Sequence, residues 1–298
     1  IINGVLITEP FKYGMVVSEI NLKFNVNGKK VELLNKDSKT VSVAKEEADK
    51  EVEKIYKPYH DRLRKIANEK IGVTLNDMVP QGKTCGVSIS FAKDTGMSSF
   101  ITDVEKYYSK ADVVSFSYDY ENIKLNRGDI KRKDIIYNYR YAGGDVTVFE
   151  MTGAQLKKYM EWSADYFDTI QKGDKNYRYN KERLKSKYVN FDIFGGVKYK
   201  IDLRNQKGQK VINLALENGE KITPEMKLKV GMNSYRFQQL IKKGGIFEGE
   251  NIKILWSSKD ELGGDAGTIQ NMMIAYIQNV KNGVINGKSH DNWEIIGL

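Results

Sequence analysis

Apolar and polar positions change period twice along residues 137–167, which read YNYRYAGGDVTVFEMTGAQLKKYMEWSADYF, and so predict a loop, a strand and a helix in succession. Side chains alternate over residues 146–151, as is typical of a strand. Thr152 and Gln155 form a capping box, so we expect the helix to begin at Gly153. One helical face would carry Leu156, Tyr159, Met160, Ser163 and Phe167. The preceding loop would carry Tyr137, Tyr139 and Tyr141, and tyrosines on such a loop are more often packing residues than ligand contacts.

Apolar residues spaced by three and four positions predict three further helices. The first would run from a cap at Ser42 to about Lys70, with a kink or break at Pro58. Its apolar positions are Val52, Ile55, Tyr56, Tyr59, Leu63 and Ile66. The second is marked by Met97, Phe100, Ile101, Val104 and Tyr108. The third is marked by Ile269, Met272, Met273, Tyr276, Ile277 and Val280, and is closed by Gly283.

Several shorter segments have the pattern of strands. Asn27 and Gly28 predict a hairpin turn between residues 22–24 and 31–33. Residues 112–116 read as a buried strand, and residues 197–203, 211–216 and 228–232 as further strands. Helices and strands alternate without a strict βαβ order, so the pattern predicts the α+β class with a mixed sheet.

The net charge of the chain does not alter the predicted fold class. The 298 residues include 48 Lys and Arg and 39 Asp and Glu, a formal net charge of +9, and the two signs are interleaved along most of the chain. Two stretches, residues 124–133 and 175–188, are richer in basic residues, and the second also carries Tyr177, Tyr179 and Tyr188. Such a segment can bind single-stranded nucleic acid, but a charged surface loop between a helix and a strand is the interpretation we favour.

Few residues suit metal or nucleophilic chemistry. A two-metal phosphoesterase centre needs several converging His, Asp and Asn ligands, and this chain has only His60 and His290. We expect His60 at the surface or at a helix flank, and His290 in a polar turn. The single cysteine, Cys85, has no histidine near it in sequence and reads as a small, buried or half-buried residue. Neither a Gly-x-Ser-x-Gly motif nor a Walker-type glycine loop occurs.

Four motifs then occur in a fixed order. They are TGAQLKKYMEWSADYF after the predicted strand, NFDIFGGVKYKIDL at residues 190–203, NSYRF at residues 233–237, and the pair Gly244 and Gly245. Together they resemble the C-terminal domain of the bacterial 5′-nucleotidase family, and most of all its 2′,3′-cyclic-nucleotide 2′-phosphodiesterase/3′-nucleotidase branch. The resemblance extends from about Ile71 to Asn292 and Trp293.

This resemblance implies a mixed sheet with flanking helices that holds a nucleoside base between two aromatic rings. A separate N-terminal metallophosphoesterase domain, with a pair of divalent metal ions, would perform the hydrolysis. Residues 1–41 would be the C-terminal remnant of that domain, since INGVLITEPFKYGMVVSEINLKF is similar to its last strands. Residues 42–72 would form a linker helix and residues 73–298 the substrate-binding domain. An ordinary surface helix explains residues 42–72 equally well.

The resemblance also implies site residues. The first stacking ring corresponds to Tyr141, with Tyr139 as the alternative if the loop register differs, and the second to Tyr235. The other implied substrate-binding residues are Asn233, Arg236, Phe237, Gly143, Gly244 and Gly245. No catalytic residue, metal ligand or cofactor is expected in this chain.

Departures from the family pattern affect the groups that would contact the edge of the base. Gly143 stands where relatives commonly carry Asn, Ile246 stands in place of an Asp, and FSYDYENIK at residues 116–124 replaces a stretch that bears an arginine. The segment FQQLIKK, at residues 237–243, is an insertion at the pocket rim. We therefore expect stacking to dominate binding and base selectivity to be broad.

Two functional hypotheses remain. The first is the recognition domain of a secreted, surface or periplasmic nucleotide hydrolase, which acts on 2′,3′-cyclic and 3′-nucleotides with its metal domain in cis and is inactive without it. The second is a stand-alone module that binds nucleotides or nucleic acid without hydrolysis. The start of the chain favours the first. No apolar run approaches the roughly 20 residues of a membrane span.

Overall fold

The computed structural model describes residues 1–185 and 191–298. The chain divides into an N-terminal unit, residues 1–64, and a C-terminal unit, residues 65–298. The end of the second basic stretch, with Lys187 and Tyr188, and the expected beginning of the next strand lie outside the described residues.

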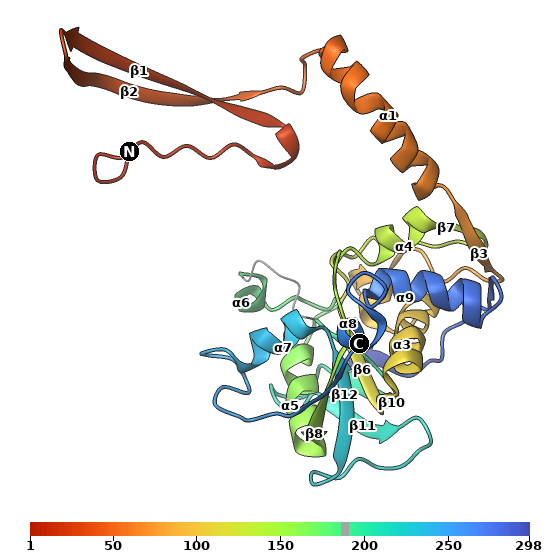
Figure 1. The fold of residues 1–298 in the computed structure, drawn as a ribbon. Coiled ribbons are helices and arrows are strands. Elements are labelled where there is room, and N and C mark those ends of the chain that lie inside the picture. Colours follow the sequence, from red (N-terminus) through yellow and green to blue (C-terminus); the bar gives the residue numbers. More distant parts are fainter. Residues whose placement is uncertain (186–190) are drawn as a thin grey trace. The chain divides into compact units, whose positions relative to one another are not determined.

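A long hairpin makes up most of the N-terminal unit (Figure 1). After the short helix η1 (Lys12–Gly14), β1 (Val16–Asn27) pairs antiparallel with β2 (Lys30–Ser42), and Asn27 lies opposite Lys30. The turn therefore falls at Gly28, as its sequence predicts. Alternation places one row of apolar side chains on a single face, and all of them are largely exposed: Ile20, Leu22, Phe24, Val26, Val31 and Leu33.

Helix α1 (Lys50–Ala67) begins later than the sequence analysis expected. Ser42 is the last residue of β2 and does not cap the helix, so that prediction was wrong. The cap is Asp49, whose Oδ1 accepts the backbone N–H groups of Glu51 at 2.8 Å and Val52 at 3.1 Å. The helix continues through Pro58, so the expected break is absent. None of its residues is buried, and its apolar stripe faces solvent in the described structure.

A five-stranded mixed sheet organises the C-terminal unit, in the order β13-β8-β12-β6-β9. Its strands are β6 (Val113–Phe116), β8 (Thr147–Thr152), β9 (Ile193–Gly195), β12 (Lys227–Met232) and β13 (Ile254–Ser257). Only β6 and β12 run parallel to each other; the other neighbours are antiparallel. Figure 1 shows α5 (Gly153–Ala164) and α7 (Ser234–Ile241) on one side of this sheet, and α3 (Gly96–Ser109) and α9 (Ile269–Ala275) on the other.

Two smaller three-stranded sheets flank this core, in the orders β11-β10-β15 and β14-β3-β7. Their strands are β10 (Val197–Asp202), β11 (Val211–Leu216), β15 (Trp293–Ile296), β3 (Lys70–Thr74), β7 (Gly128–Lys131) and β14 (Val284–Ile285). The remaining elements are β4 (Lys83–Thr84), β5 (Val87–Ser88), α2 (Ile89–Ala92), α4 (Arg132–Asn138), α6 (Lys181–Leu184), α8 (Ser258–Leu262) and η2 (Tyr276–Val280). The mixed sheet with flanking helices confirms the predicted α+β fold.

Local signals placed the elements of the core correctly. Thr152 accepts the N–H of Gln155, and Gln155 Oε1 accepts the N–H of Thr152 at 2.8 Å, so the predicted capping box begins α5 at Gly153. The expected loop with three tyrosines differs, because Tyr137 lies on α4.

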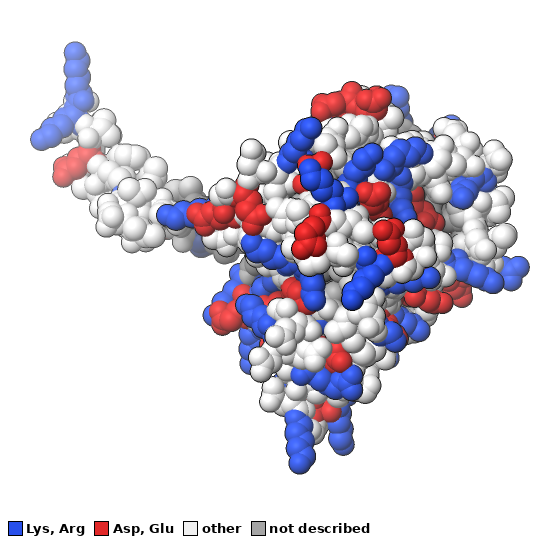
Figure 2. Space-filling view, turned by 90° about the horizontal axis from the view of Figure 1, so that it is seen from below, with Lys and Arg blue, Asp and Glu red and all other residues white. Residues whose placement is uncertain are grey.

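Among the described residues, no helix is both long and apolar enough to cross a membrane. Lys and Arg are interspersed with Asp and Glu on the face that Figure 2 shows.

Candidate functional site

A pocket lies where the C-terminal ends of β6 and β12 meet the segments that lead into β8 and β9. Because β8 and β9 run antiparallel to β12 and β6, their first residues lie at the same end of the sheet as the last residues of β6 and β12. The pocket is partly open, and its cavity volume is about 40 Å³. It is lined by Ser115, Phe116, Ser117, Tyr139, Tyr141, Tyr159, Asp192, Asn233, Tyr235 and Arg236.

Tyr141 and Tyr235 line this pocket from two segments that are far apart in sequence. Tyr141 is partly buried, and its ring packs edge-on against Tyr139 with the centroids 5.6 Å apart. Burial raises the pKa of Tyr141, although a hydrogen bond with Ser117 acts in the opposite direction. Tyr235 is in the first turn of α7 and is 49% exposed. The structure thus brings together one sheltered tyrosine ring and one accessible ring.

A buried ion pair forms the floor of the pocket. Asp192 lies 2.8 Å from Nε of Arg236, and it also accepts the hydroxyl hydrogen of Tyr159 at 2.6 Å. Burial is the largest single influence and acts to lower the pKa of Arg236, but the charge and hydrogen bond of Asp192, together with Tyr159 and Tyr141, raise it. Burial also raises the pKa of Tyr159, and the charge of Asp192 adds to that shift. Paired charges of opposite sign leave the floor polar but without net charge.

Asp145 links the two segments that carry the tyrosines. Its buried carboxylate accepts the hydroxyl of Ser234 at 2.7 Å and the backbone N–H of Ser234 at 3.3 Å. The preceding Asn233 caps α7, because its Oδ1 accepts the N–H of Tyr235 at 2.9 Å. The start of α7, with Tyr235, is therefore fixed to the segment that follows Tyr141.

Four of the residues that the sequence analysis assigned to the site do not line the pocket: Phe237, Gly143, Gly244 and Gly245. Phe237 is in the core, stacked on Phe149 with the ring centroids 3.7 Å apart. Gly143 has a φ of +75°, which allows the tight turn after Tyr141. At Gly245, a Cβ atom would come within 2.3 Å of the carbonyl oxygen of Leu240, so this glycine permits a close backbone approach. The geometry thus gives Phe237, Gly143 and Gly245 structural roles.

The pocket also contains residues to which the sequence analysis gave no role: Ser115, Phe116, Ser117, Tyr159 and Asp192. The three residues 115–117 follow from the prediction that a buried strand ends at Phe116, since ligands gather at the carboxyl ends of strands. Tyr159 had been placed on the apolar face of α5, and Asp192 lies within the motif NFDIFGG. Neither signal alone indicates that the two side chains meet.

The described residues do not fit a two-metal centre. No group of three or more His, Cys, Asp or Glu side chains in this part of the chain could hold a metal ion, and residues 186–190, SKYVN, contain none of these types. His60 is exposed on α1, and His290 Nε2 lies 3.0 Å from the carboxylate of Asp103. Cys85 is partly buried.

Comparison with known proteins gives consistent results. Among curated proteins, the chain is 24% identical over 333 residues to the trifunctional nucleotide phosphoesterase protein YfkN of Bacillus subtilis, covering 99% of the chain and 21% of that protein. It is 22% identical over 286 residues to the 2′,3′-cyclic-nucleotide 2′-phosphodiesterase/3′-nucleotidase of Haemophilus influenzae, covering 84% of the chain and 40% of that protein. The chain thus spans less than half the length of either relative.

Solved structures share the fold. A Staphylococcus aureus protein described as a 5′-nucleotidase superposes with a TM-score of 0.71 at 18% identity, over 96% of this chain and 51% of that one. The 5′-nucleotidase precursor of Thermus thermophilus gives a TM-score of 0.59 at 14% identity, over 99% of this chain and 52% of that one. The family model of the 5′-nucleotidase C-terminal domain matches residues 70–243, which is more than half of the chain. The protein therefore belongs to the 5′-nucleotidase family and contains the C-terminal domain of that family.

Proposed function

We propose that the C-terminal unit binds nucleosides and nucleotides by stacking the base between Tyr141 and Tyr235. The observation that carries this proposal is that both rings line one pocket at the carboxyl end of β12. A nucleobase has two π-faces, and each base–aromatic stack contributes about 1–3 kcal/mol. Since the whole pocket has a volume of only about 40 Å³, we infer that Tyr235 moves outward when a base enters. Its 49% exposure leaves room for that movement.

The polar groups around the rings favour broad base selectivity. Asn233 Oδ1 already accepts the N–H of Tyr235. The carboxylate of Asp192 is paired with Arg236 and accepts the hydroxyl hydrogen of Tyr159. Gly143 supplies no side chain. Few polar groups are then available to distinguish one base edge from another, so the stacking faces supply most of the affinity.

In the full-length protein, we propose that this unit delivers 2′,3′-cyclic nucleotides and 3′-nucleotides to a metallophosphoesterase domain with two divalent metal ions. The names of the Bacillus and Haemophilus relatives, which are phosphoesterases of nucleotides, support this proposal. We place the protein outside the cytoplasm, at the cell surface or in the periplasm. The hairpin β1–β2 and helix α1 would then be the end of the metal domain and the linker between the domains.

The alternative of nucleic-acid binding by residues 175–188 gains no support from the described part of this segment. Tyr177 is 8% exposed and donates its hydroxyl to the carbonyl of Ile295, and Tyr179 donates its hydroxyl to Glu121. Arg178 is paired with Asp174 at 2.8 Å. Rings that are buried or bonded in this way do not offer the stacking platform that single strands require.

Isothermal calorimetry with adenosine and adenosine 3′-monophosphate tests the stacking proposal. Tyr141→Ala and Tyr235→Ala should each weaken binding by about 1–3 kcal/mol, or roughly one to two decades in Kd. Tyr141→Phe and Tyr235→Phe keep the π-face and should be nearly neutral. Tyr137→Ala removes a partly exposed tyrosine that does not line the pocket, and it is the matched control.

Thermal unfolding of each variant is the control that tests whether the protein remains folded. Unchanged affinity in both alanine variants would remove the basis of the proposal. Affinity for adenosine should change little between low and high salt, because the pocket floor has no net charge. A steep fall with salt would instead indicate binding through basic segments.

A further inference from the structure

A second hollow, with a volume of about 490 Å³, shares no lining residue with the tyrosine pocket. One wall is α3, with Phe100 and Asp103, and another is the segment from Lys281 to His290 that includes β14. Its size lies within the 300–1,000 Å³ that is usual for small-molecule sites. Both walls belong to the C-terminal unit, so its shape is fixed by one folded body.

Part of the lining of this hollow is apolar. Leu75 and Val284 are 53% and 46% exposed, although both are aliphatic. Tyr276 and Phe100 lie beside them, with the ring centroids 6.2 Å apart. Exposed aliphatic side chains next to aromatic rings offer a site that an apolar ligand body can cover.

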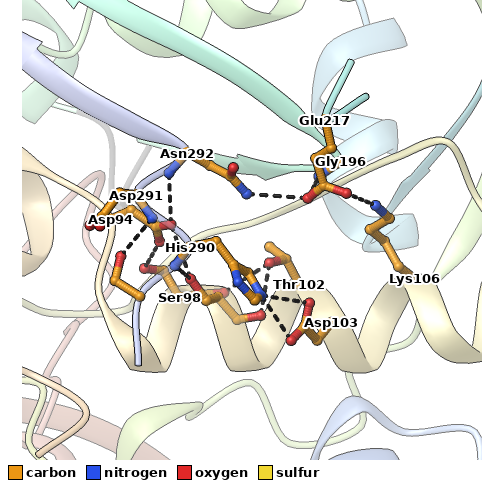
Figure 3. Close-up of polar contacts among 12 residues, drawn as sticks. Asp94, Ser98, Thr102, Asp103, Lys106, Gly196, Glu217, His290, Asp291 and Asn292 are labelled. Carbon is orange, nitrogen blue, oxygen red and sulfur yellow. Dashed lines mark hydrogen bonds and ion pairs between the residues drawn. The ribbon is translucent and has the colours of Figure 1, made fainter. Parts of the chain in front are cut away.

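Two lysines, Lys281 and Lys288, also line the hollow. The ammonium group of Lys281 lies 5.3 Å from the centroid of the Tyr276 ring. Within residues 1–185 and 191–298, neither lysine has a carboxylate within ion-pair distance. Asp103 is the acidic residue among the lining side chains, and its carboxylate is already in contact with His290, as Figure 3 shows.

The pair of Asp103 and His290 also affects the charge of the hollow. The hydrogen bond to Asp103 raises the pKa of His290, and its other acidic neighbours, Asp94 and Glu217, act in the same direction. Glu217 is itself paired with Lys106, and Asp94 accepts hydrogen bonds from Ser98 and Ser99 (Figure 3). Asp103 is thus in contact with His290 and Glu217 with Lys106, and Lys281 and Lys288 are the lining cations that such pairs leave for a ligand.

We propose that this hollow is a second ligand site, which binds a small organic anion that carries its charge on a flat apolar body. The body covers Leu75 and Val284, and the anionic group contacts Lys281 and Lys288. Both parts are required, because an exposed ion pair contributes little in water and a small apolar contact is equally weak. The inference does not rest on nucleoside binding, because the two pockets share no residue.

Phenyl phosphate is the probe, with inorganic phosphate and phenol as its separate halves. Binding is measured by calorimetry on the double variant Tyr141→Ala/Tyr235→Ala, which removes the rings of the tyrosine pocket. We expect saturable binding of phenyl phosphate with one site per chain, and binding of each half that is weaker by at least about tenfold. The combined variant Lys281→Met/Lys288→Met should weaken phenyl phosphate binding by about tenfold.

Lys110→Met is the matched control for this pair. Lys110 also lies over a tyrosine, 4.4 Å from the ring centroid of Tyr107, and Tyr107 contacts Tyr276. It does not line the hollow, so its loss lowers the charge of the region without removing a contact. Equal losses for Lys110→Met and Lys281→Met/Lys288→Met would overturn the site, because they would show a general charge effect. Equal affinity for inorganic phosphate and phenyl phosphate, or no saturable binding, would also overturn it.

Discussion

At the scale of single residues, Glu105 is unusual because its acidic side chain lies in the buried interior. It lies on α3 with 0% exposure, and neither carboxylate oxygen has a hydrogen-bond partner among the described residues. Burial raises the pKa of Glu105 well above its usual value, and the nearby charge of Asp192 adds to the shift. An unpaired carboxylate is costly in such a place, so we expect the side chain to be protonated at neutral pH.

The variant Glu105→Gln tests this protonation state. In the wild type, the folded chain keeps the proton and the unfolded chain loses it above about pH 4.3, so the contribution of Glu105 to stability falls as the pH rises. The slope is at most about 1.4 kcal/mol per pH unit for one proton. We therefore expect Glu105→Gln to have a higher Tm than the wild type at pH 8 and a similar Tm at pH 4.

Thermal unfolding from pH 4 to pH 8 provides the measurement. Glu225→Gln changes an exposed glutamate in the same way, and it should leave the pH dependence of the wild type intact. A Glu105→Gln variant whose Tm follows the wild type at every pH would show that Glu105 is ionised in the folded chain.

The resemblance to the family implied the two tyrosines that line the pocket but not the groups beneath them. Tyr141 and Tyr235 were placed through motifs, and the structure brings both to one pocket. The contact of Asp192 with Tyr159 and Arg236 joins three segments of the chain, and no local pattern encodes such a contact. The same holds for Asp145, whose partner Ser234 is distant in sequence.

At the scale of elements, success depended on whether a local signal defines the boundary. The capping box of Thr152 and the turn at Gly28 each involve neighbouring residues, and both predictions were confirmed. Ser42 is a good cap by type, but strand pairing with Val16 extends β2 through it, and Asp49 caps α1 instead. The short helix α4 was missed because its seven residues are too few to show a helical period.

Helix α1 should be less stable than helix α5. It has 18 residues and none is buried, whereas the inner face of α5 is fully packed. An unpacked helix of this length is marginal in water. Native-state hydrogen exchange should therefore show the amides of Lys50–Ala67 exchanging much faster than those of Gly153–Ala164. Equal protection of the two helices would show that α1 has a packing partner in solution.

At the scale of the whole molecule, the proposed recognition of nucleosides can be tested separately from hydrolysis. The described side chains form no group of three His, Cys, Asp or Glu that could hold a metal ion. The 298-residue chain should therefore release no phosphate from 2′,3′-cyclic AMP or 3′-AMP with manganese, cobalt or zinc added, while it still binds adenosine. A phosphate-release assay beside the calorimetry tests this, with a purified nucleotidase as the positive control. Metal-dependent turnover that follows the pure protein through chromatography would contradict the prediction.

The hairpin at the start of the chain has a consequence for handling the protein. In the described structure, β1 and β2 form a sheet of two strands, so each has one edge with open backbone groups. Its apolar face, with Ile20, Leu22 and Phe24, is uncovered as well. Strand edges and apolar faces of this kind pair readily between molecules, so we expect aggregation in concentrated solutions to begin at the hairpin. Removal of residues 16–42 should therefore raise the solubility of the C-terminal unit.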